Sequence, residues 1–262
     1  MRFPFPWMLA VLVMTPSIAR AVDADLDSRL QTLSRQRVFF GHQSVGKNIL
    51  EGLDDLSHEA GVPLRIEENG SLSAPGVVHA YLGQNTKPAS KIEAFSRALD
   101  DGPGRGAEIA FFKFCYVDFS PDTNVQQLFT AYRVALEDVR RKHPRVTLVH
   151  VTVPLTVTQT GVKASIKRLL GKAPANELEN VRREAYNALL RSAYEGKEPI
   201  FDLARVESTA EDGTRSEFER DGTRHPALAP EYTDDGEHLN TQGRRRAARA
   251  LVDVLTALPA RP

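Results

Sequence analysis

The sequence predicts an α/β protein built on a mainly parallel β-sheet, and three observations support this. Short apolar runs alternate with amphipathic helical stretches along the chain, a pattern typical of a parallel sheet covered by helices. Residues 108–116 and 146–153 are almost continuously apolar, as strands covered on both faces are. The length of 262 residues suits one sizeable domain better than two.

The first 21 residues have the features of a secretory signal. Arg2 supplies an early positive charge, residues 7–14 are apolar, and Ala19-Arg20-Ala21 forms a small-residue cleavage pattern. The apolar run is shorter than the roughly 20 residues that a membrane-spanning helix needs. We therefore expect a periplasmic or secreted mature chain, residues 22–262, without a stable membrane anchor.

The elements expected after residue 22 follow from hydrophobic periodicity. In helix 45–56 the apolar side chains recur every three to four residues, and His143-Pro144 ends helix 125–142. The expected strands are 37–40, 64–66, 108–116, 146–153 and 199–203, and the expected helices are 45–56, 92–99, 125–142, 176–194 and 240–258. Residues 69–87 and 208–237 remain unassigned, and loops of that length are often functional.

Charge and cysteine content exclude several classes of function. The chain has 34 basic and 34 acidic side chains, and loss of Arg2 and Arg20 would leave 32 and 34. A net charge of −2 argues against a nucleic-acid partner, which requires a basic excess. The single cysteine, Cys115, excludes an internal disulfide and a Cys-rich metal site. Its apolar strand predicts a buried, unreactive thiol.

The segment around Ser44 combines a strand, a tight turn and a helix start, and three interpretations fit it. Gly41, Gly46 and Lys47 match a phosphate-binding loop, although Asn48 stands where that motif needs Ser or Thr. Ser44 also suits a simple helix cap. Alternatively, Ser44 is a nucleophile at the carboxyl end of a strand, with its own N–H facing an oxyanion.

A second motif lies just before the last expected helix. Asp235 and His238 are three residues apart, so the carboxylate can reach ring Nδ1, fix the tautomer and leave Nε2 for a serine hydroxyl. A solvated acidic loop is the alternative. Together with Ser44 at the other end of an α/β domain, the motif favours a serine nucleophile with a histidine base.

With these two motifs, the chain from about residue 38 to 255 resembles a divergent branch of the SGNH (GDSL-like) hydrolases. In that family the nucleophilic serine follows the first strand, and Asp-x-x-His precedes the last helix. The resemblance implies a three-layer α/β/α flavodoxin-like fold and a serine esterase that hydrolyses acyl or acetyl esters. It implies catalytic roles for Ser44, Asp235 and His238, and it implies neither a metal nor an organic cofactor.

The sequence departs from the family pattern around the expected oxyanion hole. The family's Gly-Asp-Ser is Gly-His-Gln-Ser here, and residues 114–118 lack the asparagine that normally binds the oxyanion. We expect the N–H groups of Ser44 and Gly83 to serve, with Asn85 as a substitute donor. His42, Tyr116 and Asp118 are expected to line the substrate cleft.

The predicted function is therefore ester hydrolysis through an acyl-enzyme, on a small-molecule or glycan ester such as an acylated carbohydrate. Transfer of the acyl group to a sugar hydroxyl is a variant of the same chemistry. Because the expected oxyanion asparagine is missing, a weak or inactive SGNH-fold protein that binds carbohydrate or serves in assembly is the alternative. The phosphate-binding loop is a third interpretation.

Overall fold

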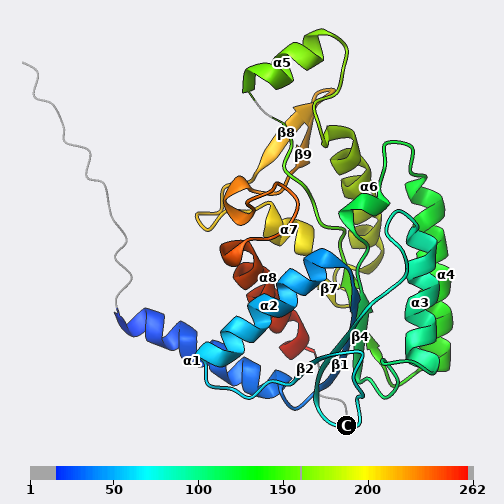
Figure 1. Ribbon diagram of the computed structural model, residues 1–262, viewed down its shortest axis with the longest axis vertical. Coiled ribbons are helices and arrows are strands. Elements are labelled where there is room, and N and C mark those ends of the chain that lie inside the picture. Colours follow the sequence, from blue (N-terminus) through cyan, green and yellow to red (C-terminus); the bar gives the residue numbers. More distant parts are fainter. Residues whose placement is uncertain (1–15, 160, 259–262) are drawn as a thin grey trace, which may run out of the picture.

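The computed structural model describes residues 16–159 and 161–258, shown in Figure 1. The expected signal segment lies mostly outside these residues, and its last part belongs to helix α1 (Pro16–Leu33). None of the helices in the described ranges is long and apolar enough to cross a membrane.

The central sheet has five parallel strands in the order β2-β3-β1-β4-β5, so β1 lies in the middle. The strands are β1 (Arg37–His42), β2 (Ile66–Glu68), β3 (Gly76–Tyr81), β4 (Ile109–Phe112) and β5 (Thr147–Leu148). One residue later the chain forms β6 (His150–Val151), which pairs in parallel with β7 (Ile200–Phe201). The sheet places the carboxyl ends of β1, β3 and β4 side by side.

Helices cover the sheet on both sides, giving the three layers visible in Figure 1. One side carries α1, α2 (Ser44–Glu59) and α8 (Thr241–Thr256), and the other carries α3 (Pro88–Asp100), α4 (Val125–Lys142) and α6 (Glu177–Tyr194). Side chains alternate along β1 as the pleat requires. Val38 and Phe40 join the core beneath α2 and α8, whereas Phe39 joins the core beneath α3 and α4.

Helices α2 and α8 pack closely because Gly52 has no side chain. A Cβ atom on Gly52 would lie 2.3 Å from the backbone oxygen of Arg244. Ion pairs reinforce the contact: Arg244 reaches Asp55 at 2.8 Å, and both terminal nitrogens of Arg245 reach the Glu59 carboxylate at 2.6 Å. This pairing brings the first turn of α2 beside the segment that precedes α8.

The α/β class and the five-stranded parallel sheet are confirmed, but the expected strands were partly wrong. Strand β3 lies inside the unassigned stretch 69–87. It was missed because its run Gly-Val-Val-His-Ala-Tyr has only two apolar residues before the histidine. The long strand expected over 108–116 ends at Phe112, and the chain then turns into a 3₁₀ helix, η1 (Tyr116–Asp118).

Several further elements were not expected. The stretch 208–237 contains an antiparallel hairpin, β8 (Glu217–Arg220) and β9 (Thr223–Pro226), and a 3₁₀ turn, η2 (Pro230–Tyr232). Two short helices, α5 (Gly161–Leu169) and α7 (Leu203–Glu207), were also missed, as was α1. Short elements provide too few periods to be identified from apolar spacing alone.

Candidate active site

Ser44 is the first residue of α2, at the carboxyl end of the central strand. Only Gln43, in an extended conformation, separates it from β1. Gln43 occupies the N-cap position and Ser44 the first helical position, so the simple cap interpretation is wrong. The Ser44 hydroxyl instead lies 3.0 Å from Nε2 of His238, while its N–H belongs to the first helical turn, where no intrahelical acceptor exists.

His238 and Asp235 lie in the loop that enters α8. Asp235 Oδ2 lies 2.7 Å from His238 Nδ1, and Asp235 Oδ1 accepts the backbone N–H groups of Glu237 and His238, both at 2.8 Å. The backbone hydrogen bond from His238 is the main cause that holds the pKa of Asp235 well below its usual range. The carboxylate is therefore charged at neutral pH and accepts the Nδ1–H, which leaves Nε2 to accept the Ser44 hydroxyl proton.

We call residues 233–240, which carry Asp235 and His238, the triad loop. Capping and cross-helix hydrogen bonds attach this loop to α2 and α8. Asn240 caps α8 by accepting the Gly243 N–H at 3.0 Å, and Thr233 Oγ1 accepts the Gly236 N–H at 2.9 Å. Asn48, one turn after Ser44, accepts the Leu239 N–H at 3.3 Å. Asn48 thus connects the serine helix directly to the histidine segment.

The interpretation of residues 41–47 as a phosphate-binding loop is wrong, because the strand and the helix leave no room for such a loop. Residue His42 still belongs to β1, and Gly46 lies inside α2, where an added Cβ would meet the His42 Cβ at 2.2 Å. A loop that wraps a phosphate needs several residues between strand and helix, and only Gln43 is available.

Tyr116 packs against His238 on the side of Ser44. Its ring meets the imidazole edge to face at 5.8 Å between centroids, and its hydroxyl lies 3.5 Å from His238 Nε2. The hydroxyl donates to Glu237 Oε2 at 2.8 Å. Burial, followed by Glu237, raises the pKa of Tyr116 well above its usual value. Tyr116 is thus a neutral donor beside the triad, and Glu237 is a neighbour that sequence reasoning missed.

The loop after β3 approaches Ser44 through Gln43. The Gln43 side-chain amide donates to the carbonyl of Leu82 at 2.9 Å and to that of Gly83 at 3.4 Å. Gly83 has φ +62°, and a Cβ there would lie 2.7 Å from both Lys91 N and Ser90 Oγ, so only glycine fits. These contacts, made by the carbonyl groups, place the Gly83 segment next to the start of α2.

Asn85 and Asp118 both contact the buried side chain of Lys91. Lys91 Nζ donates to Asn85 Oδ1 at 3.0 Å and forms an ion pair with Asp118, whose carboxylate also accepts the N–H groups of Thr86 and Cys115. Asp118 is 5% exposed, so the expectation that it lines the cleft is wrong. Asp118 holds the loop after β3 and the loop after β4 together. Asn85 is exposed, and its side-chain oxygen accepts the hydrogen bond from Lys91.

His42 does not line the cleft either. It is 1% exposed, its Nδ1 lies 2.7 Å from the Gln43 carbonyl, and its Nε2 lies 2.9 Å from His79 Nδ1. Burial is the main cause that lowers the pKa of His42 to about 3. His42 is therefore a neutral core histidine beneath the first turn of α2. Cys115 is buried, as predicted.

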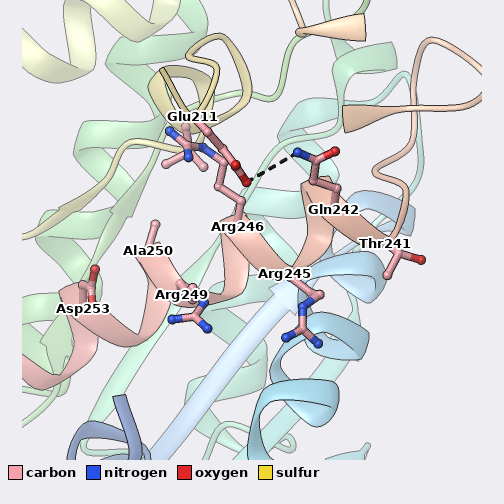
Figure 2. Close-up of a pocket in the computed structure, with 9 residues that line it drawn as sticks. Glu211, Thr241, Gln242, Arg245, Arg246, Arg249, Ala250 and Asp253 are labelled. Atoms are coloured by element: carbon pink, nitrogen blue, oxygen red, sulfur yellow. Dashed lines mark hydrogen bonds between the residues drawn. The ribbon is translucent and has the colours of Figure 1, made fainter. Parts of the chain in front are cut away.

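Three arginines of α8, Arg245, Arg246 and Arg249, line a cavity along that helix. The cavity has a volume of about 680 Å³. Figure 2 shows its lining residues, including Gln242, whose side chain donates to Glu211 at 3.4 Å. Arg245 is paired with Glu59, and the guanidinium of Arg246 lies 5.5 Å from the ring centroid of Tyr232. Within residues 16–159 and 161–258, no three His, Cys, Asp or Glu side chains are grouped to hold a metal ion.

The triad itself is open to solvent, with side-chain exposures of 37% for His238 and 55% for Asp235. Ser44, His238 and Asp235 form one continuous series of hydrogen bonds. That geometry suits acyl transfer to and from a serine.

No protein-family model and no curated protein matches this sequence. Among solved structures, a GDSL-like lipase from Bacteroides thetaiotaomicron VPI-5482 is similar with a TM-score of 0.51 and 14% identity, over 91% of this chain and 99% of that one. A member of the lipolytic G-D-S-L family from Veillonella parvula DSM 2008 has a TM-score of 0.47 and 14% identity, over 84% and 98%. The comparison with the Bacteroides structure, at a sequence identity typical of a divergent branch, shows that this chain has the fold of the GDSL-like (SGNH) hydrolases.

Proposed function

We propose that this protein is an exported serine ester hydrolase of SGNH type. The observation that carries the proposal is the hydrogen-bonded series from Ser44 Oγ to His238 Nε2 and from His238 Nδ1 to Asp235. The fold alone does not decide function. A serine, a neutral histidine and a charged aspartate in hydrogen-bond contact are the parts that nucleophilic acyl chemistry requires.

The proposed reaction has two steps. Ser44 Oγ attacks the acyl carbonyl while His238 Nε2 takes its proton, and the protonated imidazole then gives that proton to the departing alkoxide. The acyl group now forms an ester with Ser44. A water molecule, deprotonated by His238, attacks this ester, and the proton returns to Ser44 as the carboxylic acid leaves. A sugar hydroxyl in place of water would give acyl transfer.

The oxyanion that forms in each step needs donors near Ser44. We propose the N–H groups of Ser44 and Gly83 for this role. Gln43, which precedes Ser44, donates to the Leu82 and Gly83 carbonyls and so brings the two segments together. We add Asn85 as a third donor, because Lys91 holds its oxygen and leaves the amide NH₂ free to point outward. One such side-chain donor contributes about 10²–10³ in rate.

The open site leaves room for an ester on a larger molecule such as a glycan. We propose a glycan ester, such as an acylated carbohydrate, or a small-molecule ester as the substrate. The nearly balanced charge offers no attraction to nucleic acid.

Export is proposed from the signal-like residues 1–21. Mass spectrometry of the exported protein should show a chain that begins at Val22, and an intact Met1 would contradict export by cleavage.

The decisive experiment combines p-nitrophenyl acetate turnover with labelling by a fluorophosphonate. We expect the probe to label Ser44 in the wild type and in a Ser96→Ala control, which changes a serine within α3. Ser44→Ala and His238→Ala should lose both turnover and labelling. Equal turnover in all four proteins, or none together with no labelling, would instead support a non-catalytic carbohydrate-binding or assembly protein.

A further inference from the structure

Helix α5 lies in a segment that projects from the body of the protein between Val157 and Asn176. We call this segment the excursion. Gln159 N–H donates to the Ala175 carbonyl at 3.3 Å, and the Asn176 side chain donates to the Val157 carbonyl at 3.0 Å. These bonds close the base of the excursion. Figure 1 shows α5 projecting at the end of the molecule that carries the β8–β9 hairpin, away from the layered core.

The outer face of α5 is apolar and uncovered. Val162, Ile166, Leu169 and the following Leu170 are 77%, 51%, 88% and 68% exposed. Among the described side chains these are four of the six exposed large hydrophobic residues. Their spacing places Val162, Ile166 and Leu169 within about 60° of one another around the helix. Ala164, on the opposite side, is fully buried, so this apolar stripe points away from the protein.

Basic side chains flank the apolar stripe. Lys163, Lys167, Arg168 and Lys172 lie in the excursion, and no acidic residue occurs between Val157 and Asn176. The rest of the chain has 30 basic and 34 acidic residues, a net charge of −4, so this local excess of four positive charges is a distinctive feature. Lys163 and Lys172 are exposed. A helix with one apolar face and adjacent basic residues binds anionic lipid surfaces by burying the first and attracting headgroups with the second.

The excursion is attached to the triad loop. At its base the Val157 N–H donates to the Gly236 carbonyl at 2.9 Å, and the Val157 side chain lies next to Gly236. Gly236 stands between Asp235 and His238. A surface bound by α5 would therefore lie on the same end of the molecule as the candidate active site.

We propose that α5 and Leu170 form a docking surface for an anionic phospholipid bilayer. Val162, Ile166, Leu169 and Leu170 enter the headgroup region, and Lys163, Lys167 and Lys172 contact lipid phosphates. The charge of the excursion selects this occupant, because a second copy of α5 would bring like charges together. The inference concerns binding and stands whether or not Ser44 is catalytic.

Co-sedimentation with lipid vesicles tests the proposal. The full chain is mixed with vesicles of phosphatidylcholine alone or of equal parts phosphatidylcholine and phosphatidylglycerol. We expect strong binding to the anionic vesicles only. Lys163→Gln/Lys167→Gln should weaken it about 25-fold, since each basic side chain near such a surface contributes about fivefold. Ile166→Gln/Leu169→Gln should reduce binding at least as much.

Matched controls change the same residue types elsewhere. Val134→Gln removes an exposed apolar side chain of α4, and Arg105→Gln/Lys197→Gln removes two exposed charges. Both should bind like the wild type. Residues 7–14, the apolar run of the expected signal segment, are the same in every variant. A difference in vesicle binding between variants therefore reports on α5. Unchanged binding in the α5 variants, or no binding by the wild type, would overturn the proposal. Self-association lost in Ile166→Gln/Leu169→Gln without vesicle binding would assign the stripe to a second copy.

Discussion

Replacing Asp235 by asparagine should disable the triad while leaving its shape intact. Asp235 Oδ1 accepts two backbone N–H groups, and Oδ2 faces His238 Nδ1 at 2.7 Å. In Asp235→Asn the amide oxygen must keep the backbone N–H groups, because the NH₂ group cannot accept them. The NH₂ group then faces Nδ1 and makes that nitrogen an acceptor.

The tautomer that results cannot act as a base toward Ser44. If Nδ1 accepts, the single ring proton of neutral His238 sits on Nε2, which lies 3.0 Å from the Ser44 hydroxyl. Nε2–H has no lone pair for the serine proton, and the imidazolium loses its counter-charge. In serine hydrolases this change lowers kcat about 10⁴-fold, and we expect a loss of that order here.

The assay is p-nitrophenyl acetate turnover measured with the rate of fluorophosphonate labelling, and the thermal midpoint serves as a check on folding. Asp234→Asn is the matched control, since it makes the same change one residue away on an exposed carboxylate that accepts a hydrogen bond from Asn240. We expect the control to retain wild-type rates. A value for Asp235→Asn within about tenfold of the wild type would refute this assignment of the base.

Three further predictions concern the structure around the site. Asp118→Asn should lower the free energy of unfolding by about 3–5 kcal/mol, because it leaves the Lys91 charge buried and unpaired; urea denaturation would measure this, and a loss under about 1 kcal/mol would contradict it. The folded pKa of His42, about 3, lies below its unfolded value of 6.5, so the unfolded state binds more protons between these pH values. Stability should therefore be fully present above pH 6.5 and fall with acidification by up to about 1.4 kcal/mol per pH unit, a slope that His42→Gln should reduce in urea denaturation at several pH values. Gly52→Ala would place a Cβ 2.3 Å from the Arg244 backbone oxygen and should cost about 1–3 kcal/mol, with a parallel loss of turnover as α8 moves from α2; unchanged thermal and kinetic values would contradict it.

Features that depend on neighbours in sequence could be predicted well. Helix 125–142 was correct at both ends, because its apolar spacing is regular and His143-Pro144 stops it. The Asp235–His238 contact spans three residues, so a turn is enough to form it. The position of Ser44 at a strand–helix junction could likewise be predicted, because the apolar residues change there from a continuous run to a spacing of three to four.

The burial of two polar side chains could not be predicted. Asp118 and His42 are polar residues beside the expected site, and sequence reasoning placed both in the cleft. Their partners decide otherwise: Lys91 is 27 residues from Asp118, and His79 is 37 residues from His42. Strand β3 was missed for a related reason, since only its place between β1 and β2 makes its weak apolar run a strand.

The sequence by itself therefore determined the α/β class, the two motifs and the chemical types of the three triad residues, all of which rest on local periodicity and spacing. Only the tertiary structure decided that Ser44 and His238, 194 residues apart, come within 3.0 Å of each other. That distance depends on α2 packing against α8 through Gly52 and on Asn48 holding Leu239. Close packing between distant elements is set by the shape of the whole core, which no local pattern encodes.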